Sequence, residues 1–213
     1  MAKILRFLFF TLIVRTVVLF VLGLNVRHRE RLPTQGKAIV VANHNSHLDT
    51  LVLMTLLPLK LLPKVQPVAA ADYFLRNKLL AWFALNIIGI LPMKRTRANR
   101  AEDPLAPIEA ALNQGHILIF FPEGSRGEAE QLTDFKTGIA HLAERCPDVP
   151  VIPVYLHGLG KALPKGEGLL VPFFCDVFIG EALTWTGDRL GYMKLLSDTM
   201  HQLAAEGQFP AWE

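Results

Sequence analysis

Short continuous runs of hydrophobic, often β-branched residues recur along the chain after Pro33, and longer mixed stretches of hydrophobic and polar residues separate them. A short apolar run is typical of a strand buried on both faces, whereas a longer run with polar positions at helical spacing is typical of a helix. The runs predict strands at residues 37–42, 65–70, 116–121, 151–156 and 171–180, and a short strand or loop at 89–93. The mixed stretches predict helices at residues 46–57, 72 to about 86, 134–145 and 188–205, and one that begins between Pro104 and Pro107 and ends at Gly115.

This alternation of strands and helices predicts an α/β fold, in which a mostly parallel sheet is flanked by helices on both faces. In such sheets, binding and catalytic sites lie beyond the carboxyl ends of the strands. The polar segments in those places are residues 43–49, 94–100, 122–127 and 157–160. We therefore expect the functional side chains in these segments.

The first 29 residues differ from the rest of the chain in charge and hydropathy. They contain no acidic residue, and residues 7–24 carry a single charge, that of Arg15. A basic and strongly apolar terminus is typical of contact with a membrane that contains anionic lipid. The basic residues of this segment are Lys3, Arg6, Arg15, Arg27 and Arg29.

Three interpretations of this segment compete. A secretory signal peptide requires a cleavage site of small residues, but residues 23–26 are Gly-Leu-Asn-Val. A spanning helix would place Arg15 near the bilayer centre, at a cost of about 2.5–3.5 kcal/mol. Basic residues flank both ends, which favours a segment embedded without crossing, with both ends on the cytoplasmic side. We therefore expect a membrane-anchoring helical segment at residues 1–32 and an α/β domain at 33–213, located at the cytoplasmic face of the cytoplasmic (inner) membrane.

The composition excludes several classes of protein. Of the 213 residues, 51% are hydrophobic and 19% are charged, which is too apolar for a disordered chain. The 15 Gly and 14 Pro residues follow no period, so a collagen-like rod is excluded as well. The two cysteines, Cys146 and Cys175, match neither a disulfide framework nor a zinc-ligand spacing, and we expect no metal.

The segment NHNSHLD, residues 43–49, offers a histidine and a carboxylate at the end of a predicted strand. Asp49 would lie in the first turn of the following helix, from where its carboxylate can reach back to the ring of His44. Such a carboxylate keeps one ring nitrogen protonated and leaves the other as a base near neutral pH. A purely structural interpretation stays open, because Ser46 and Asp49 also resemble a capping box. We interpret His47 as structural.

A second polar segment, FPEGSRG at residues 121–127, directly follows the clearest predicted strand. It presents Glu123, Ser125 and Arg126 between two glycines, Gly124 and Gly127, where backbone can approach a ligand closely. Arginine grips phosphate with two parallel donors, so this turn is a candidate phosphate site. The spacing is not that of a nucleophile elbow, which requires G-x-S-x-G.

Two further segments carry weaker signals. Lys94, Arg95, Arg97 and Arg100 form a basic cluster that either holds a phosphate or is a solvated face. No aromatic residues are interleaved with this cluster, so we expect no nucleic acid partner. The run at residues 151–158 is mainly core strand, and we assign no chemistry to His157.

Taken together, the four segments resemble the glycerolipid acyltransferase superfamily, which includes 1-acyl-glycerol-3-phosphate acyltransferases. The matching blocks occur in the family's order, from about Ala38 to Gly158. They are His44 and Asp49 for HxxxxD, Gly89 and Arg95 for a Gly followed six residues later by Arg, residues 121–126 for FPEG(T/S)R, and residues 151–154 for a V-I-P-V strand. Two positions depart from the family pattern: Lys94 stands where an acidic residue is common, and Ser125 replaces the commoner Thr.

The resemblance implies an acyltransferase domain at residues 33–213. It implies transfer of an acyl group from acyl-CoA or acyl carrier protein to the hydroxyl of 1-acyl-sn-glycerol-3-phosphate, without an acyl-enzyme and without a cofactor. His44 would be the general base, oriented by Asp49, and Arg95 and Arg126 would hold the phosphate. Glu123, together with Gly124 and Ser125, would position the acceptor. The partners implied are a membrane lipid and the acyl donor.

Several alternatives remain open at this point. The same chemistry could act on glycerol-3-phosphate, a lysophospholipid or a lyso-aminolipid, and the acyl-chain length is not determined. A hydrolase that uses Ser46 or Ser125 as nucleophile is a second class, and a lipid-binding module without activity is a third. The apolar residues 79–93 either line a groove for an acyl chain or form plain core.

Overall fold

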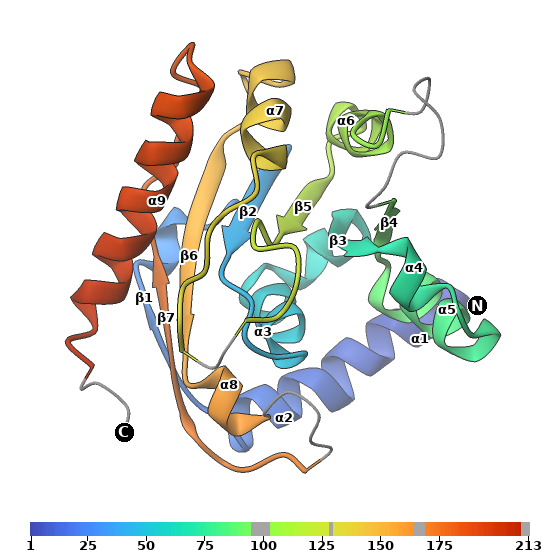
Figure 1. The fold of residues 1–213 in the computed structure, drawn as a ribbon. Coiled ribbons are helices and arrows are strands. Elements are labelled where there is room, and N and C mark those ends of the chain that lie inside the picture. The colour runs from blue at the N-terminus through green and yellow to red at the C-terminus, as the bar shows by residue number, and fades with distance from the viewer. Residues whose placement is uncertain (95–102, 128–129, 164–168, 210–213) are drawn as a thin grey trace.

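A computed structural model describes residues 1–94, 103–127, 130–163 and 169–209. Its centre is a seven-stranded sheet in the order β1-β7-β6-β2-β5-β3-β4 (Figure 1). Neighbouring strands are parallel except for β6 and β7, which are antiparallel. The strands are β1 (Gly23–Arg27), β2 (Ala38–Ala42), β3 (Val65–Ala70), β4 (Leu91–Met93), β5 (Ile117–Phe120), β6 (Val151–His157) and β7 (Phe174–Ile179). The predicted α/β fold with a mostly parallel sheet is confirmed.

The helices lie between the strands and on both sides of the sheet. The α-helices are α1 (Ala2–Leu8), α2 (Arg15–Phe20), α3 (Leu48–Leu56), α4 (Ala71–Phe74), α5 (Lys78–Phe83), α6 (Ala106–Asn113), α7 (Gly138–Arg145), α8 (Leu159–Ala162) and α9 (Arg189–Glu206). Two π-helical segments, η1 (Phe9–Val14) and η4 (Ala84–Ile88), continue α1 and α5, and short 3₁₀ turns are η2 (Arg29–Arg31) and η3 (Leu59–Lys64).

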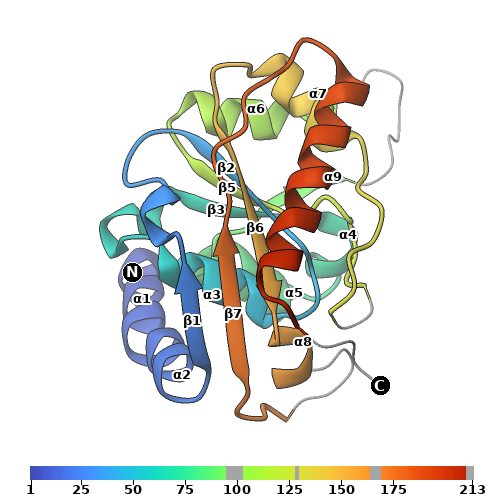
Figure 2. The ribbon, with the colours of Figure 1, turned by 90° about the vertical axis from the view of Figure 1, so that its left-hand side faces the viewer.

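Both faces of the central strands are buried, which explains their continuous apolar runs. Along β2, Val40 packs into a core that includes the N-terminal helix and α3, whereas Ile39 packs into a core that includes α6, α7 and α9. Successive side chains of a strand point to opposite faces, so one run of apolar residues supplies both cores. Figure 2 shows α1 and α2 on one side of β1 and β7, and α9 on the other.

Two predicted helices differ in extent from those observed. The helix predicted from residue 72 is divided, because the Asn77 side chain accepts hydrogen bonds from the backbone N–H groups of Leu79 (2.8 Å) and Leu80 (3.4 Å) and starts α5. Asp72 is a residue type that commonly caps helices, and the sequence predicts it as the cap of this helix, but α4 has Ala70 at its N-cap without a side-chain hydrogen bond. The helix predicted at 134–145 begins only at Gly138, because the residues before it form a loop in which the N–H of Lys136 donates to the carbonyl oxygen of Pro122, just after β5.

The sequence does not predict β1, which pairs with β7 in parallel from Gly23 opposite Phe174 to Arg27 opposite Phe178. It is an edge strand with alternating partial burial, and its pattern is too short to be distinguished from the apolar residues before it. Residues 1–29 therefore contain a helical stretch and a strand of the sheet.

The helical stretch from Ala2 to Phe20 is attached to the sheet along one side. Phe10, Val14 and Val18 recur every four residues and are buried in the core of that face. Large hydrophobic side chains on its other side are exposed: Ile4, Leu5, Phe7, Leu8, Leu12, Ile13, Leu19 and Phe20. Among the described residues, no helix has the length and apolar character needed to cross a membrane.

Candidate active site

His44 lies just beyond the carboxyl end of β2 and is held by Asp49 from the first turn of α3. The Nδ1 atom of His44 is 2.9 Å from Oδ2 of Asp49. Because the carboxylate accepts, Nδ1 carries the proton, and a neutral ring then has Nε2 as its proton acceptor. The ring is also stacked on Phe121 at 4.1 Å between centroids, which fixes its plane. The sequence-based pairing of His44 with Asp49 is thus present in the structure.

Asp49 also organises the backbone before α3. Its Oδ2 atom accepts hydrogen bonds from the N–H groups of Asn45 (2.7 Å) and Ser46 (2.8 Å). Burial raises the pKa of this fully buried carboxyl, and the hydrogen bonds from His44 and from the two backbone groups oppose that rise. The Asp49 carboxylate thus both binds the backbone before α3 and orients the His44 ring. The structural and the catalytic interpretation of residues 43–49 are therefore compatible. The Ser46 hydroxyl accepts a hydrogen bond from the N–H of Leu48 (3.3 Å), the first residue of α3, and donates to the carbonyl oxygen of Leu163 (3.0 Å).

The turn after β5 lies against the His44 loop. The N–H of Gly127 donates to the carbonyl oxygen of His44 over 3.0 Å, so the two loops are joined directly. Gly124 has a φ of +74°, a left-handed conformation that favours glycine and turns the chain back on itself. Gly124, Ser125 and Arg126 line the same cavity as His44. The structure therefore brings together these three predicted residues and the His44–Asp49 pair.

Glu123 lies beside this group but is itself buried. Only 4% of its surface is exposed, and it is not among the described residues that line the cavity. Burial raises the pKa of Glu123 to about 7, and the charge of Asp49 adds to the rise. Thr133 and the backbone of His44 approach its carboxylate and oppose that rise, but among the described residues neither oxygen has a partner within normal hydrogen-bond geometry. Such a carboxyl group is close to half protonated near neutral pH.

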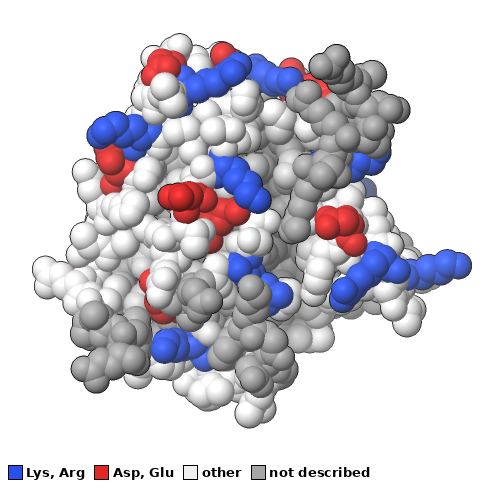
Figure 3. All heavy atoms as spheres, in the orientation of Figure 1, with Lys and Arg blue, Asp and Glu red and all other residues white. Residues whose placement is uncertain are grey.

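The cavity in front of His44 has a volume of about 790 Å³, which is in the usual range for small-molecule sites. One wall is polar and carries His44, Ser125 and Arg126, and the remainder is largely apolar. Apolar side chains from the segment 79–93 that line it are Leu80, Phe83, Ala84, Ile88, Ile90 and Met93. Part of this segment therefore lines the cavity, and part of it, including Ala84, Ile87 and Ile90, is buried as core. Figure 3 shows this face hollowed near its centre, with Lys and Arg side chains on several sides.

Two cavity residues were not identified as functional from the sequence. Lys136 lies in the turn before α7, which the sequence predicts as helix, so no local pattern marked it. His47, interpreted as structural, also lines the cavity. Burial lowers the pKa of His47, and the nearby charges of Arg126 and His44 lower it further. His47 is therefore favoured in its neutral form.

Other candidate residues fall outside the cavity or outside the described part of the chain. Arg95, Arg97 and Arg100 lie outside the described residues, whereas Lys94 lines the cavity. His157 is buried 3.0 Å from the carboxylate of Glu130 and does not line the cavity. Among the described residues there is no group of three or more side chains placed to hold a metal ion.

The cysteines are also removed from the cavity. Cys146 and Cys175 are both buried and free, and neither is among the described cavity residues. Burial raises the pKa of the Cys175 thiol to about 12, so it is a poor nucleophile.

Known proteins that are similar to this chain in sequence or in fold are described as acyltransferases. Residues 23–157 match the model of a family described as Acyltransferase. A protein from Arabidopsis thaliana named 1-acyl-sn-glycerol-3-phosphate acyltransferase LPAT1, chloroplastic, is 32% identical over 149 residues, which cover 69% of this chain and 40% of that protein. The mouse 1-acyl-sn-glycerol-3-phosphate acyltransferase alpha is 29% identical over 168 residues, covering 78% of this chain and 54% of that protein. The chain thus spans about half, or less, of the length of these relatives.

A solved structure has the same fold. It is the crystal structure of the 1-acyl-sn-glycerophosphate (LPA) acyltransferase PlsC from Thermotoga maritima, with a TM-score of 0.76 and 21% sequence identity. The similarity covers 100% of this chain and 81% of that one, which places β1 and the N-terminal helix within the shared fold. Because the family model spans well over half of the chain, from β1 to the end of β6, this protein belongs to the Acyltransferase family.

Proposed function

We propose that this protein transfers an acyl group from an acyl thioester to the free hydroxyl of 1-acyl-sn-glycerol-3-phosphate, and so forms phosphatidic acid. The names of the two curated relatives and of the structural neighbour support this substrate. The observation that carries the proposal is the His44–Asp49 pair, which shares one cavity with Arg126 and with a large apolar wall. A lysolipid acceptor with a phosphate needs a base for its hydroxyl, a group that binds its phosphate, and an apolar surface for its acyl chain.

In the proposed reaction, Nε2 of His44 removes the proton from the acceptor hydroxyl as the oxygen attacks the carbonyl carbon of the thioester. A C–O bond forms, the C–S bond then breaks, and the leaving thiolate takes the proton back from His44. Asp49 holds the ring and stabilises the imidazolium that forms between these steps. The step needs no enzyme nucleophile, which is consistent with the buried positions of Cys146 and Cys175. The donor is acyl-CoA or acyl carrier protein.

The remaining cavity residues bind and position the substrates in this proposal. Arg126, with Arg95, holds the phosphate through charge-assisted hydrogen bonds. The buried carboxyl group of Glu123, next to Gly124 and Ser125 in the chain, helps to place the acceptor. The apolar wall formed by residues 79–93 receives an acyl chain.

We further propose that the N-terminal helix anchors the protein in one leaflet, at the cytoplasmic face of the cytoplasmic (inner) membrane. Its exposed apolar side chains continue onto α5, where Leu79 is 81% and Trp82 50% exposed. A groove of about 370 Å³ runs between them, lined by Leu5, Leu8, Phe9, Leu12, Ile13, Trp82, Phe83 and Ile87. An exposed apolar surface of this kind is typical of a membrane or protein contact. Lys3 and Lys78 flank it and would meet anionic headgroups.

The test is an acyl-transfer assay with purified full-length protein, labelled acyl-CoA and a panel of acceptors. The panel contains lysophosphatidic acid, glycerol-3-phosphate, a lysophospholipid and a lyso-aminolipid, with products identified by mass. We expect labelled phosphatidic acid to be the main product, and none with His44→Ala. A main product from another acceptor would overturn the substrate, and release of free fatty acid alone would indicate a hydrolase.

A further inference from the structure

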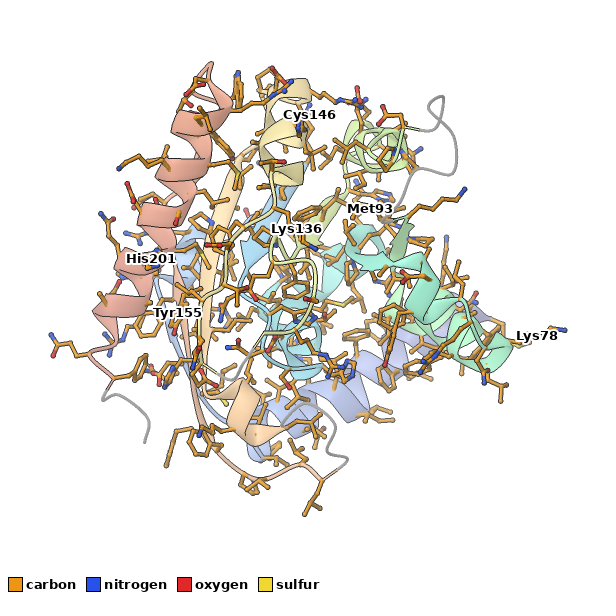
Figure 4. The ribbon with its side chains drawn as sticks, viewed as in Figure 1. Lys78, Met93, Lys136, Cys146, Tyr155 and His201 are labelled. Atoms are coloured by element: carbon orange, nitrogen blue, oxygen red, sulfur yellow. The ribbon has the colours of Figure 1, made fainter. Side chains whose placement is uncertain are left out.

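Lys136 occupies a defined place at the mouth of the cavity. Its backbone N–H donates to the carbonyl oxygen of Pro122 over 2.9 Å, which joins the start of α7 to the turn after β5. Lys136 lines the cavity together with Ser125, Arg126 and His44. Figure 4 shows it near the middle of this face of the molecule, remote from the exposed end of α5 where Lys78 lies.

The side chain of Lys136 lies over Gly124. A Cβ atom built on Gly124 would be 2.6 Å from Nζ of Lys136 and 3.0 Å from its Cδ and Cε atoms. The stem of the lysine therefore occupies the space that a side chain at position 124 would fill. The ammonium group is held against the backbone of the turn that carries Ser125 and Arg126.

Lys136 has no acidic partner in the part of the chain that the structure describes. Lys37 and Lys194 each form an ion pair with an aspartate, but Lys136 forms none with any of the residues that the structure describes. Lys136 adds a second cation to the cavity wall that carries Arg126. Such a wall attracts an anion, and a phosphate group accepts hydrogen bonds from a lysine and an arginine at once.

We propose that Lys136 binds a phosphate group of a substrate, as a second cation beside Arg126. This inference rests on the proposed function and assigns a binding role to a residue outside the sequence motifs. The acceptor is the source that the geometry favours. In 1-acyl-sn-glycerol-3-phosphate the reacting hydroxyl and the phosphate are on neighbouring carbons, so the phosphate must lie close to His44 when the hydroxyl does. The acyl donor carries phosphates as well, and the experiment separates the two sources.

The experiment compares wild type with Lys136→Met, which removes the charge and keeps most of the stem, and with Lys136→Arg, which restores the charge. Lys194→Met, on the outer helix α9, is the matched control. We expect Lys136→Met to raise the KM for lysophosphatidic acid about tenfold, which corresponds to about 1.4 kcal/mol. The KM for a phosphate-free monoacylglycerol should stay unchanged. Lys136→Arg should recover most of the loss, and Lys194→Met should behave as wild type.

The donor is tested with acyl-CoA and with a phosphate-free acyl thioester of N-acetylcysteamine. A rise in KM confined to acyl-CoA would support phosphate binding by Lys136 but assign it to the donor. Unchanged KM values for both phosphate-bearing substrates would overturn the proposal.

A binding measurement separates this proposal from the proposed function. Inorganic phosphate should raise the melting temperature of wild type and of Lys194→Met, and raise it less for Lys136→Met. Each melting curve without phosphate reports whether the variant is folded. If wild type acylates none of the acceptors but phosphate stabilises it through Lys136, only the proposed function fails. If phosphate stabilises Lys136→Met as well as wild type, the inference about Lys136 is wrong.

Discussion

At the scale of single residues, the site depends on two buried carboxyl groups that differ in how well they are hydrogen-bonded. Asp49 receives hydrogen bonds on Oδ2 from His44 and from two backbone N–H groups, so its charged form is stabilised. Glu123 is almost as deeply buried, but the contacts of its carboxylate with Thr133 and with the backbone of His44 lie outside normal hydrogen-bond geometry. The first group is suited to orient a base, and the second is retained at a cost in stability.

The first prediction concerns His44. His44→Ala should lower acyl transfer by at least about 10²–10³-fold, because no other group described in the cavity is oriented by a buried carboxylate. Asp49→Asn should also be severe, since an amide favours the wrong ring tautomer. The measurement is the turnover rate under saturating donor and acceptor, with circular dichroism as the control for folding. Near-normal turnover of a folded His44→Ala would exclude the general-base mechanism.

The second prediction concerns Glu123 and pH. Burial raises the pKa of Glu123 from 4.5 to about 7, so the folded protein holds its proton at pH values where the unfolded chain has lost it. The free energy of unfolding therefore falls as the pH rises through this range, by up to about 3 kcal/mol, and is constant above it. Glu123→Gln stays neutral at every pH. Urea unfolding should show this variant more stable than wild type at about pH 8, and equally stable near pH 4.5. A difference that is the same at both pH values would contradict a raised pKa for Glu123.

At the scale of elements, Arg6 forms a hydrogen bond between the N-terminal helix and the sheet, in addition to the packing of that helix on the core. Nη2 of Arg6 donates to the carbonyl oxygen of Val65, at the start of β3, over 2.8 Å. Its guanidinium lies over Gly89, the left-handed residue that ends η4. Gly89, which opens the second motif of the family resemblance, therefore has a packing role: the absence of a side chain leaves room for Arg6.

A third prediction follows from this contact. Gly89→Ala should destabilise the protein for two reasons, a φ of +74° and a Cβ atom only 2.6 Å from Nη1 of Arg6. Gly36 has the same φ of +74° but nothing within 4 Å of its Cβ position, so Gly36→Ala measures the backbone strain alone. We expect Gly36→Ala to cost about 1–2 kcal/mol and Gly89→Ala clearly more in urea unfolding. Equal losses would show that the Arg6 side chain moves away without cost.

At the scale of the whole molecule, one face of the N-terminal helix packs in the core and the opposite face is exposed. One face supplies Phe10, Val14 and Val18 to the core, so removal of the whole segment would also damage the fold. The other face exposes Leu12 (63%), Ile13 (56%) and Leu19 (63%). Substitutions on this outer face can therefore test membrane binding without loss of the core.

The fourth prediction uses this division. The triple variant Leu12→Ser, Ile13→Ser and Leu19→Ser should bind vesicles of mixed neutral and anionic lipid at least about tenfold more weakly than wild type, because each lost apolar side chain removes about 1.5–3 kcal/mol of possible burial. Leu190→Ser is the matched control, since Leu190 is 82% exposed but lies on α9, on the other side of the sheet. Wild-type binding should persist in high salt, which screens only the charges. Release of wild type by salt alone would indicate a purely electrostatic contact.

Much of the fold and part of the site could be predicted from the sequence, because the signals involved are local. The strands at β2, β5 and β6 are buried on both faces, so each has a continuous apolar run that depends only on its own residues. His44 and Asp49 are five positions apart. Because His44 lies just after a strand and Asp49 lies in the first turn of the next helix, this separation brings the two side chains into contact. The residues at 123–126 are likewise presented by a single turn.

Other features depend on tertiary packing, because they join residues from distant parts of the chain. Lys136 reaches the cavity because its backbone bonds to Pro122, and nothing in its neighbourhood in the sequence marks it. Glu123 is in a motif, but its burial, and with it the raised pKa, results from packing. The contact of Arg6 with Gly89 joins residues 83 positions apart, and β1 is a strand only because β7 lies beside it. Hydrophobic spacing and motifs specify each segment by itself, whereas these features depend on which segments the sheet order places side by side.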